Sequence, residues 1–222
     1  SSAFTRSGWR DKSGVVIDRM KRAATSGPLD ALLRDVRACR ICEGKLPLGP
    51  RPVLRASTAA QILIVGQAPG ARVHETGIPW NDPSGDRLRK WMDVNRDTFY
   101  DESRIAIIPM GYCYPGRHER GGDLGPRKEC AEHWLPKLLS LMPNIEFTIL
   151  AGQYAQRHFL GEQIMGSLTE TVRNWKEYFP RYLPIPHPSP RNTLWLKRNA
   201  WFEGNVVPKL RARVADILRN MK

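Results

Sequence analysis

The sequence contains no long hydrophobic run. No apolar stretch approaches the roughly 20 residues that a helix needs to cross a bilayer, and residues 1–21 lack the continuous apolar block of a secretory signal. We therefore expect a cytoplasmic protein that makes no membrane contact. Hydrophobic residues nonetheless make up 41% of the 222 residues and include seven tryptophans, which predicts a folded core.

Acidic residues are scarce relative to basic ones. The chain has 22 of the first and 35 of the second, which gives a formal net charge of +13. A chain this basic most often binds a polyanion, and nucleic acid is the commonest. The basic residues are spread along the whole chain, so a generally basic surface without such a partner remains an alternative.

The chain has only four cysteines, Cys39, Cys42, Cys113 and Cys130. In a reducing compartment we expect no disulfide framework. A zinc ribbon usually presents two C-x-x-C pairs close in sequence, whereas here only Cys39 and Cys42 form such a pair. Four thiolates gathered from distant points favour a [4Fe–4S] cluster, which takes one cysteine per iron. Zinc, or buried or redox thiols without a metal, remain alternatives.

Short apolar stretches alternate with helical patterns from residue 29 onwards. The patterns predict strands at 62–66, 105–110, 147–151 and 183–187, and helices at 29–38, 85–94, 128–142, 154–160 and 200–220. This alternation predicts an α/β fold, a three-layer α/β/α sandwich around a short, mainly parallel four-stranded sheet. We expect residues 29–222 to form a single domain, preceded by a basic N-terminal extension over residues 1–28.

Distinctive residues follow the predicted strands. The first strand leads into the glycine-rich loop Gly66–Gly70 and then into Gly77-Ile78-Pro79-Trp80; the last leads into the run H-P-S-P-R-N, which begins at His187. Glycines allow a backbone to approach a ligand closely, and Trp80 offers a flat aromatic face. Because ligands of such folds bind at the carboxyl ends of the strands, we expect these loops to form one site.

These motifs together resemble the uracil-DNA glycosylase superfamily over roughly residues 29–215. The glycine loop, the six residues after it and the G-x-P-aromatic run are similar to those of the iron–sulfur classes, families four and five. The spacing of the four cysteines also resembles that of these classes. The H-P-S-P-R-N run resembles the single-strand-selective monofunctional class.

The resemblance implies a DNA repair enzyme that flips a deaminated base, uracil above all, out of DNA and hydrolyses its N-glycosidic bond. It implies that Trp80 stacks on the base and that His187 donates a hydrogen bond to the departing base. The loop containing Gly66, Gln67, Ala68, Pro69 and Gly70 would hold the base or a phosphate. It further implies a monomer with a structural [4Fe–4S] cluster on the four cysteines. Contacts to DNA would come from Ser189, Arg191, Asn192 and a wedge at Leu194 and Trp195. These last two side chains could equally pack under the loop.

The chain departs from these families at the carboxylate that positions the attacking water. Gln67 stands where family four has glutamate, and Ala68 stands where family one has aspartate. We expect Asp82, shortly after Trp80, to take over this role. Asp82 could instead only cap the next helix, or Gln67 could orient the water unaided.

A second departure concerns how the base is read. Pro109 stands where family four has an asparagine that distinguishes uracil from cytosine. Backbone groups around Met110 are candidates for a replacement. Deaminated purines therefore remain possible substrates. Two further hypotheses stay open: a lesion-binding or product-trapping protein without turnover, and a zinc-stabilised hydrolase that acts on a nucleotide.

Overall fold

The computed structural model describes residues 27–221, so nearly all of the expected N-terminal extension lies outside the described residues. Four strands form the centre of the structure: β1 (Ile62–Val65), β2 (Ile105–Ile107), β3 (Phe147–Ala151) and β4 (Tyr182–Ile185). The α-helices are α1 (Pro28–Arg37), α2 (Ala71–Thr76), α3 (Pro83–Met92), α4 (Arg96–Tyr100), α5 (Lys128–His133), α6 (Leu135–Ser140), α7 (Gln153–Leu160), α8 (Leu168–Arg173), α9 (Thr193–Arg198) and α10 (Val207–Asn220).

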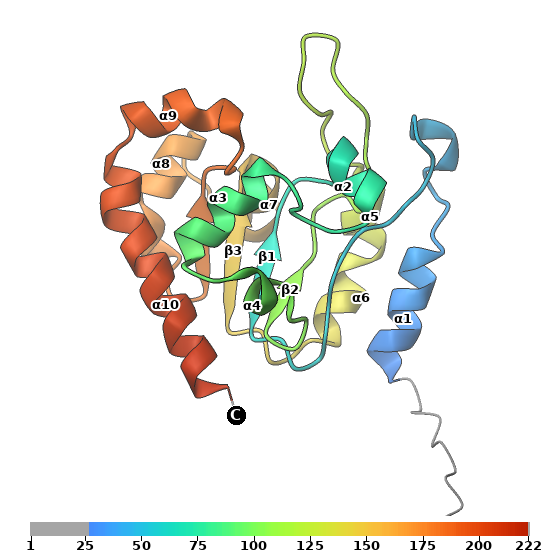
Figure 1. Cartoon of the computed structure of the whole chain (residues 1–222), viewed down its shortest axis with the longest axis horizontal. Helices are drawn as coiled ribbons and strands as arrows, with labels where there is room; N and C mark the ends of the chain where they lie inside the picture. Colours follow the sequence, from blue (N-terminus) through green and yellow to red (C-terminus); the bar gives the residue numbers. More distant parts are fainter. Residues whose placement is uncertain (1–26, 222) are drawn as a thin grey trace, which may run out of the picture.

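The four strands form one parallel sheet in the order β2-β1-β3-β4 (Figure 1). Ile62 of β1 pairs with Ile105 of β2 on one side and with Phe147 of β3 on the other. All strands therefore end at the same edge of the sheet. This confirms the α/β fold with a parallel four-stranded sheet.

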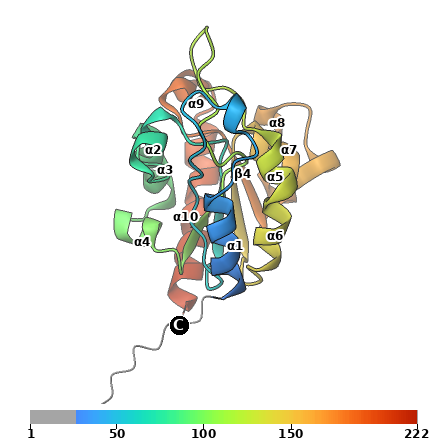
Figure 2. The same ribbon diagram turned by 90° about the vertical axis from the view of Figure 1, so that its right-hand side faces the viewer.

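Alternate residues of each strand point to opposite faces of the sheet, and helices cover both faces. Leu63 and Val65 pack into a cluster with buried residues of α1, α5, α6 and α7. Ile62 and Ile64 pack into a second cluster with residues of α3, α4, α8 and α10. The structure is thus the expected three-layer sandwich, seen from the side in Figure 2.

Two helices differ from the sequence prediction. The expected helix at 128–142 is interrupted at Trp134 between α5 and α6, because Pro136 has no backbone N–H to continue the ladder from α5. The expected helix at 200–220 begins with the π-helical turn Phe202–Val206 before α10. The short helices α2, α4, α8 and α9 were not predicted, since segments of five or six residues carry little periodicity.

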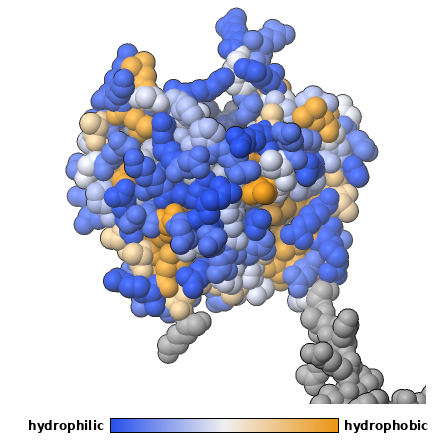
Figure 3. Space-filling model, viewed as in Figure 1, coloured by the Kyte–Doolittle hydropathy of each residue, from blue (hydrophilic) through white to orange (hydrophobic). Residues whose placement is uncertain are grey.

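The surface in the view of Figure 1 is mostly hydrophilic, with small separate hydrophobic patches (Figure 3). None of the helices between residues 27 and 221 combines the length and the apolar character that crossing a membrane requires.

Candidate active site

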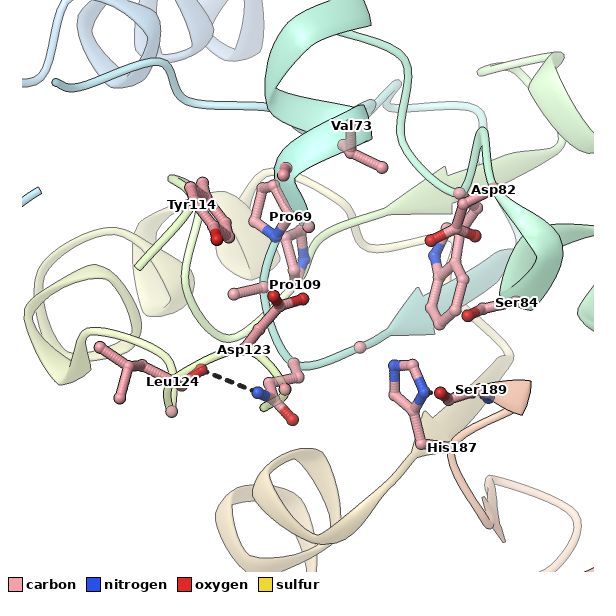
Figure 4. Close-up of a pocket in the computed structure, with 18 of the residues that line it drawn as sticks. Pro69, Val73, Asp82, Ser84, Pro109, Tyr114, Asp123, Leu124, His187 and Ser189 are labelled. Atoms are coloured by element: carbon pink, nitrogen blue, oxygen red, sulfur yellow. Dashed lines mark hydrogen bonds between the residues drawn. The ribbon is translucent and has the colours of Figure 1, made fainter. Parts of the chain in front are cut away.

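A cavity of about 720 Å³ lies at the carboxyl ends of the strands. Loops after β1, β2 and β4 and the start of α3 surround it (Figure 4). The expected site residues that it brings together are Gly66, Gln67, Ala68, Pro69, Gly70, Trp80, Asp82, His187, Ser189, Arg191 and Asn192. Motifs up to 126 positions apart in sequence, from Gly66 to Asn192, thus line one cavity.

Trp80 is held between two glycines of the surrounding backbone. A Cβ atom on Gly66 would lie 2.8 Å from Cζ2 of Trp80, and one on Gly85 would overlap the Trp80 carbonyl oxygen. Trp80 itself has a φ of 55°, in the left-handed region. Its carbonyl oxygen accepts a hydrogen bond from Arg89 Nη1 at 3.2 Å. Gly66 therefore leaves room for the indole and Gly85 for the Trp80 backbone, and a larger residue at either position would require a shift.

The pKa of His187 in the cavity differs strongly from that of a free histidine. Burial lowers the pKa of His187 to about 4, although the negative charge of Asp82 opposes this shift. The imidazole stacks on Trp80, with ring centroids 5.3 Å apart and an angle of 30° between the planes. Its Nδ1 accepts a hydrogen bond from the Ser189 backbone N–H at 3.2 Å. The neutral ring therefore carries its proton on Nε2, where it is available as a donor.

We expect the ring of His187 to stay neutral when the pH falls from 7 to 5 and to titrate near pH 4. Above pH 6.5, histidine is neutral in the folded and the unfolded chain, so it adds no pH dependence to stability. Below pH 6.5 the unfolded chain binds a proton that folded His187 does not bind, so stability falls between pH 6.5 and pH 4. Nitrogen NMR of the imidazole measures the midpoint. A midpoint near 6.5 in the folded protein, as in the urea-unfolded chain, would contradict this environment.

Asp82 lies in the cavity and also caps α3. Its Oδ1 accepts a hydrogen bond from the Gly85 backbone N–H at 2.8 Å. Asp82 therefore caps α3, as one alternative predicted, and its side chain also lines the cavity. Asp82 and His187 lie on the same side of the cavity in Figure 4.

The start of α3 and the His187 loop are tied together by Arg87. Its Nη1 donates hydrogen bonds to the carbonyl oxygens of Ser189 at 3.0 Å and of Pro188 at 3.3 Å. Within the same loop, Asn192 Nδ2 donates to the His187 carbonyl oxygen at 2.7 Å. These bonds fix the relative positions of Asp82 and His187.

Three residues expected in the site lie outside the cavity. Met110 is only 6% exposed and packs in the core, and its backbone N–H already donates to the Gly66 carbonyl oxygen at 2.9 Å. Trp195 packs against Trp201 and donates from Nε1 to Thr169 Oγ1 at 2.8 Å, so this side chain is a packing residue. Leu194 is 57% exposed on α9, so of the two residues expected to form a wedge only Leu194 has a mostly exposed side chain.

One wall of the cavity was not predicted at all. It comes from the loop between Cys113 and Cys130, which extends away from the body of the protein in Figure 1. Arg191 packs closely against the backbone of Gly122 in this loop, where a Cβ atom would overlap its guanidinium group. The basic residues Arg117 and Arg120 in this segment were the one signal in the sequence. The lining residues that the loop contributes are Tyr114, Arg117, His118, Gly121, Gly122, Asp123, Leu124 and Gly125.

The four cysteines lie away from the cavity, in a separate group. Cys42, Cys113 and Cys130 are buried, Cys39 is half-buried, and Cys42 packs with Cys113 and Leu46. Burial raises the pKa of Cys113 to about 11 and that of Cys130 to about 12, and the other cysteines of the group add to both shifts. The four sulfurs are therefore electrostatic neighbours, as a shared site requires.

Hydrogen-bond donors point at these sulfur atoms. Trp134 Nε1 donates to Cys39 Sγ at 3.4 Å, and the Tyr112 backbone N–H donates to Cys130 Sγ at 3.5 Å. Such donors stabilise thiolates and are a usual feature of iron–sulfur sites. In residues 27–221, no three or more histidine, cysteine or acidic side chains converge closely enough to hold a single metal ion. Four cysteine thiolates, two of them with N–H donors at sulfur, are the donor type that a [4Fe–4S] cluster takes, one cysteine per iron.

Comparison with known families agrees with the fold and with the cavity. The family model described as the uracil DNA glycosylase superfamily matches residues 55–211, more than half of the chain. The match includes the glycine loop, Trp80, Asp82 and the His187 loop, and begins after Cys39 and Cys42. The chain therefore belongs to the uracil DNA glycosylase superfamily, which indicates a DNA glycosylase that acts on DNA.

Proposed function

We propose that the protein excises a deaminated base from DNA, uracil in the first place, by hydrolysing its N-glycosidic bond to leave an abasic site. The observation that carries this proposal is the neutral imidazole of His187, stacked on Trp80 at the end of the sheet with its Nε2 proton free to donate. A neutral donor of this kind suits a base that leaves as an anion.

The chemistry follows from where charge develops. The enzyme flips the nucleotide out of the duplex, at an unstacking cost of a few kcal/mol, and the base lies against the stacked pair of Trp80 and His187. As the glycosidic bond breaks, negative charge grows on the O2 atom of uracil. The Nε2 proton, which lies in the plane of the His187 ring, stabilises this charge from the edge of the ring. Asp82, beside His187, positions the water that attacks the sugar. Because the transition state is largely dissociative, the carboxylate has only a modest role.

The proposed DNA contacts surround the mouth of the cavity. The phosphates next to the flipped nucleotide bind to Ser189, Arg191 and Asn192. Leu194 fills the space that the base leaves in the duplex. The net charge of +13 favours binding to the phosphate backbone. We also propose that the enzyme acts as a monomer.

We further propose that Cys39, Cys42, Cys113 and Cys130 hold a [4Fe–4S] cluster. Their burial, their mutual proximity and the N–H donors at the sulfur atoms support this assignment. When bound, the cluster supplies structural cross-linking and no redox step. It ties the end of α1 to both ends of the loop that lines the cavity.

An excision assay on single- and double-stranded DNA with one uracil tests the proposal, with alkali to cut abasic sites. Wild type is expected to cleave at uracil, and Asp82→Asn is expected to lower kcat by about 10²-fold, at the low end of general-base contributions. Asparagine caps a helix as well as aspartate does, so the variant keeps the Gly85 bond and the fold. Equal rates for both proteins would assign Asp82 to capping alone.

A second candidate substrate class is a deaminated purine. Pro109 lines the cavity and has no side-chain donor or acceptor to select a pyrimidine, and a cavity of about 720 Å³ has room for the larger base. The same assay with hypoxanthine and xanthine distinguishes the two classes. Bound DNA without cleavage at any of these bases would instead indicate a lesion-binding protein.

A further inference from the structure

The loop between Cys113 and Cys130 brings one carboxylate into the cavity, that of Asp123. Oδ2 of Asp123 lies 3.3 Å from the position that a Cβ atom on Gly70 would occupy, so the carboxylate faces the glycine loop. The next residue, Leu124, accepts a hydrogen bond on its carbonyl oxygen from Gln67 Nε2 at 2.9 Å. The loop is therefore anchored to the wall of the cavity directly beside Asp123.

The carboxylate of Asp123 has no hydrogen bond or ion pair with any other part of the chain between residues 27 and 221. Nearby charged side chains nonetheless affect this carboxylate. Burial raises the pKa of Asp123, Arg191 and Arg117 oppose this shift, and the charge of Asp82 adds to it. Both oxygen atoms are thus available to a ligand in the cavity.

Asp123 lies on the wall opposite the catalytic pair. Figure 4 shows Asp123 with Pro69 and Pro109 on one side of the cavity, and Asp82 and His187 on the other. In uracil the ring N–H at N3 neighbours O2 and points away from N1, the atom that carries the sugar. A base that presents its O2 atom to His187 therefore directs this N–H away from the sugar and into the cavity, whose other wall contains Asp123. On that wall, the proline at position 109 offers no polar side-chain group.

We propose that Asp123 recognises deaminated bases by accepting a hydrogen bond from the ring N–H that deamination creates. This inference rests on the proposed function, because it takes the cavity as the base pocket. Uracil carries a proton on N3 and hypoxanthine on N1, whereas cytosine and adenine have unprotonated nitrogen atoms there. A carboxylate accepts from the ring N–H of the first pair and repels the ring-nitrogen lone pair of the second, so at this position Asp123 would favour uracil and hypoxanthine over their parent bases.

Binding without turnover tests this inference separately from catalysis. Single-stranded oligonucleotides with one 2′-fluoro-2′-deoxyuridine resist cleavage, because the fluorine disfavours the cationic sugar, and the matching 2′-fluoro-2′-deoxycytidine strands serve as reference. Fluorescence anisotropy should show that wild type binds the uracil strand about 10- to 100-fold more tightly, as expected for one hydrogen bond to a charged group. Asp123→Ala should abolish this preference, and Asp123→Asn, which keeps an acceptor oxygen, should restore uracil binding. Glu119→Ala, in the same loop but outside the cavity, should keep the preference.

Two results would overturn the inference: an Asp123→Ala variant that still prefers uracil, or a wild type that prefers neither strand. A preference that depends on Asp123 together with no excision would sustain base recognition and refute the glycosylase. Excision together with a preference that does not depend on Asp123 would sustain the glycosylase and refute base recognition by Asp123.

Discussion

Replacing His187 with alanine is expected to lower kcat for uracil excision by about 10²- to 10³-fold, the usual effect of removing one donor to a developing anion. The loss should appear in kcat more than in KM, because charge on the base arises only in the transition state. The imidazole also packs on Trp80, so its removal leaves the indole without its stacking partner. Single-turnover kinetics with excess enzyme would measure the effect on the chemical step.

The matched control for this change is His158→Ala. His158 is an exposed histidine on α7 outside the cavity, so its removal should leave kcat unchanged. Both variants should bind undamaged DNA as wild type does, since neither histidine is proposed to contact phosphate. Full activity in His187→Ala would show that another group stabilises the leaving base, and the proposed mechanism would then be wrong.

Replacing Cys113 with serine is expected to abolish binding of the proposed iron–sulfur cluster and most of the folded stability with it. Cys113 is buried at the start of the loop that lines the cavity, and it packs on Cys42. Because the unfolded chain has no preformed thiolate site, the free energy of metal binding also stabilises the fold, so loss of the cluster should release both α1 and this loop. Purified wild type should be brown with absorbance near about 400 nm, whereas Cys113→Ser should be colourless and melt at a lower temperature.

Met110→Leu separates loss of the cluster from general damage to the core. Met110 is buried near the same segment, and this swap conserves volume, so it should cost less than about 1.5 kcal/mol and keep the iron. Iron and sulfide analysis of both variants completes the measurement. An active, iron-free wild type would exclude the cluster.

The sheet could be predicted from the sequence because each strand is a short, wholly buried apolar run, such as Ile62–Val65. Two predicted strands were too long at their carboxyl ends. Pro109 cannot donate to a ladder, and β2 ends before it. β4 ends at Ile185, two residues before the predicted end. The break at Trp134 also follows from a proline, but periodicity alone did not reveal it. Hydrophobic periodicity therefore located the elements, whereas the positions of the prolines were needed to place some of their ends.

The candidate site was predictable where its residues follow strands, as with Gly66 and His187. Asp123 could not be predicted, because its place depends on how a loop with few apolar residues folds back over the cavity. Trp195, in contrast, was expected in the site but lies outside it. An aromatic residue beside a binding loop has the same sequence signature whether it faces DNA or, as here, packs against Trp201.

The bonds from Arg87 to the His187 loop have an evolutionary consequence. They join Asp82 and His187 into one unit, whereas Asp123 belongs to a separate loop anchored through Leu124. If Asp82 and His187 act as proposed, mutations in that loop can change which base is accepted without altering the spacing of these two groups. Substrate range and reaction chemistry are thus encoded in different segments of this chain, and selection can act on each independently.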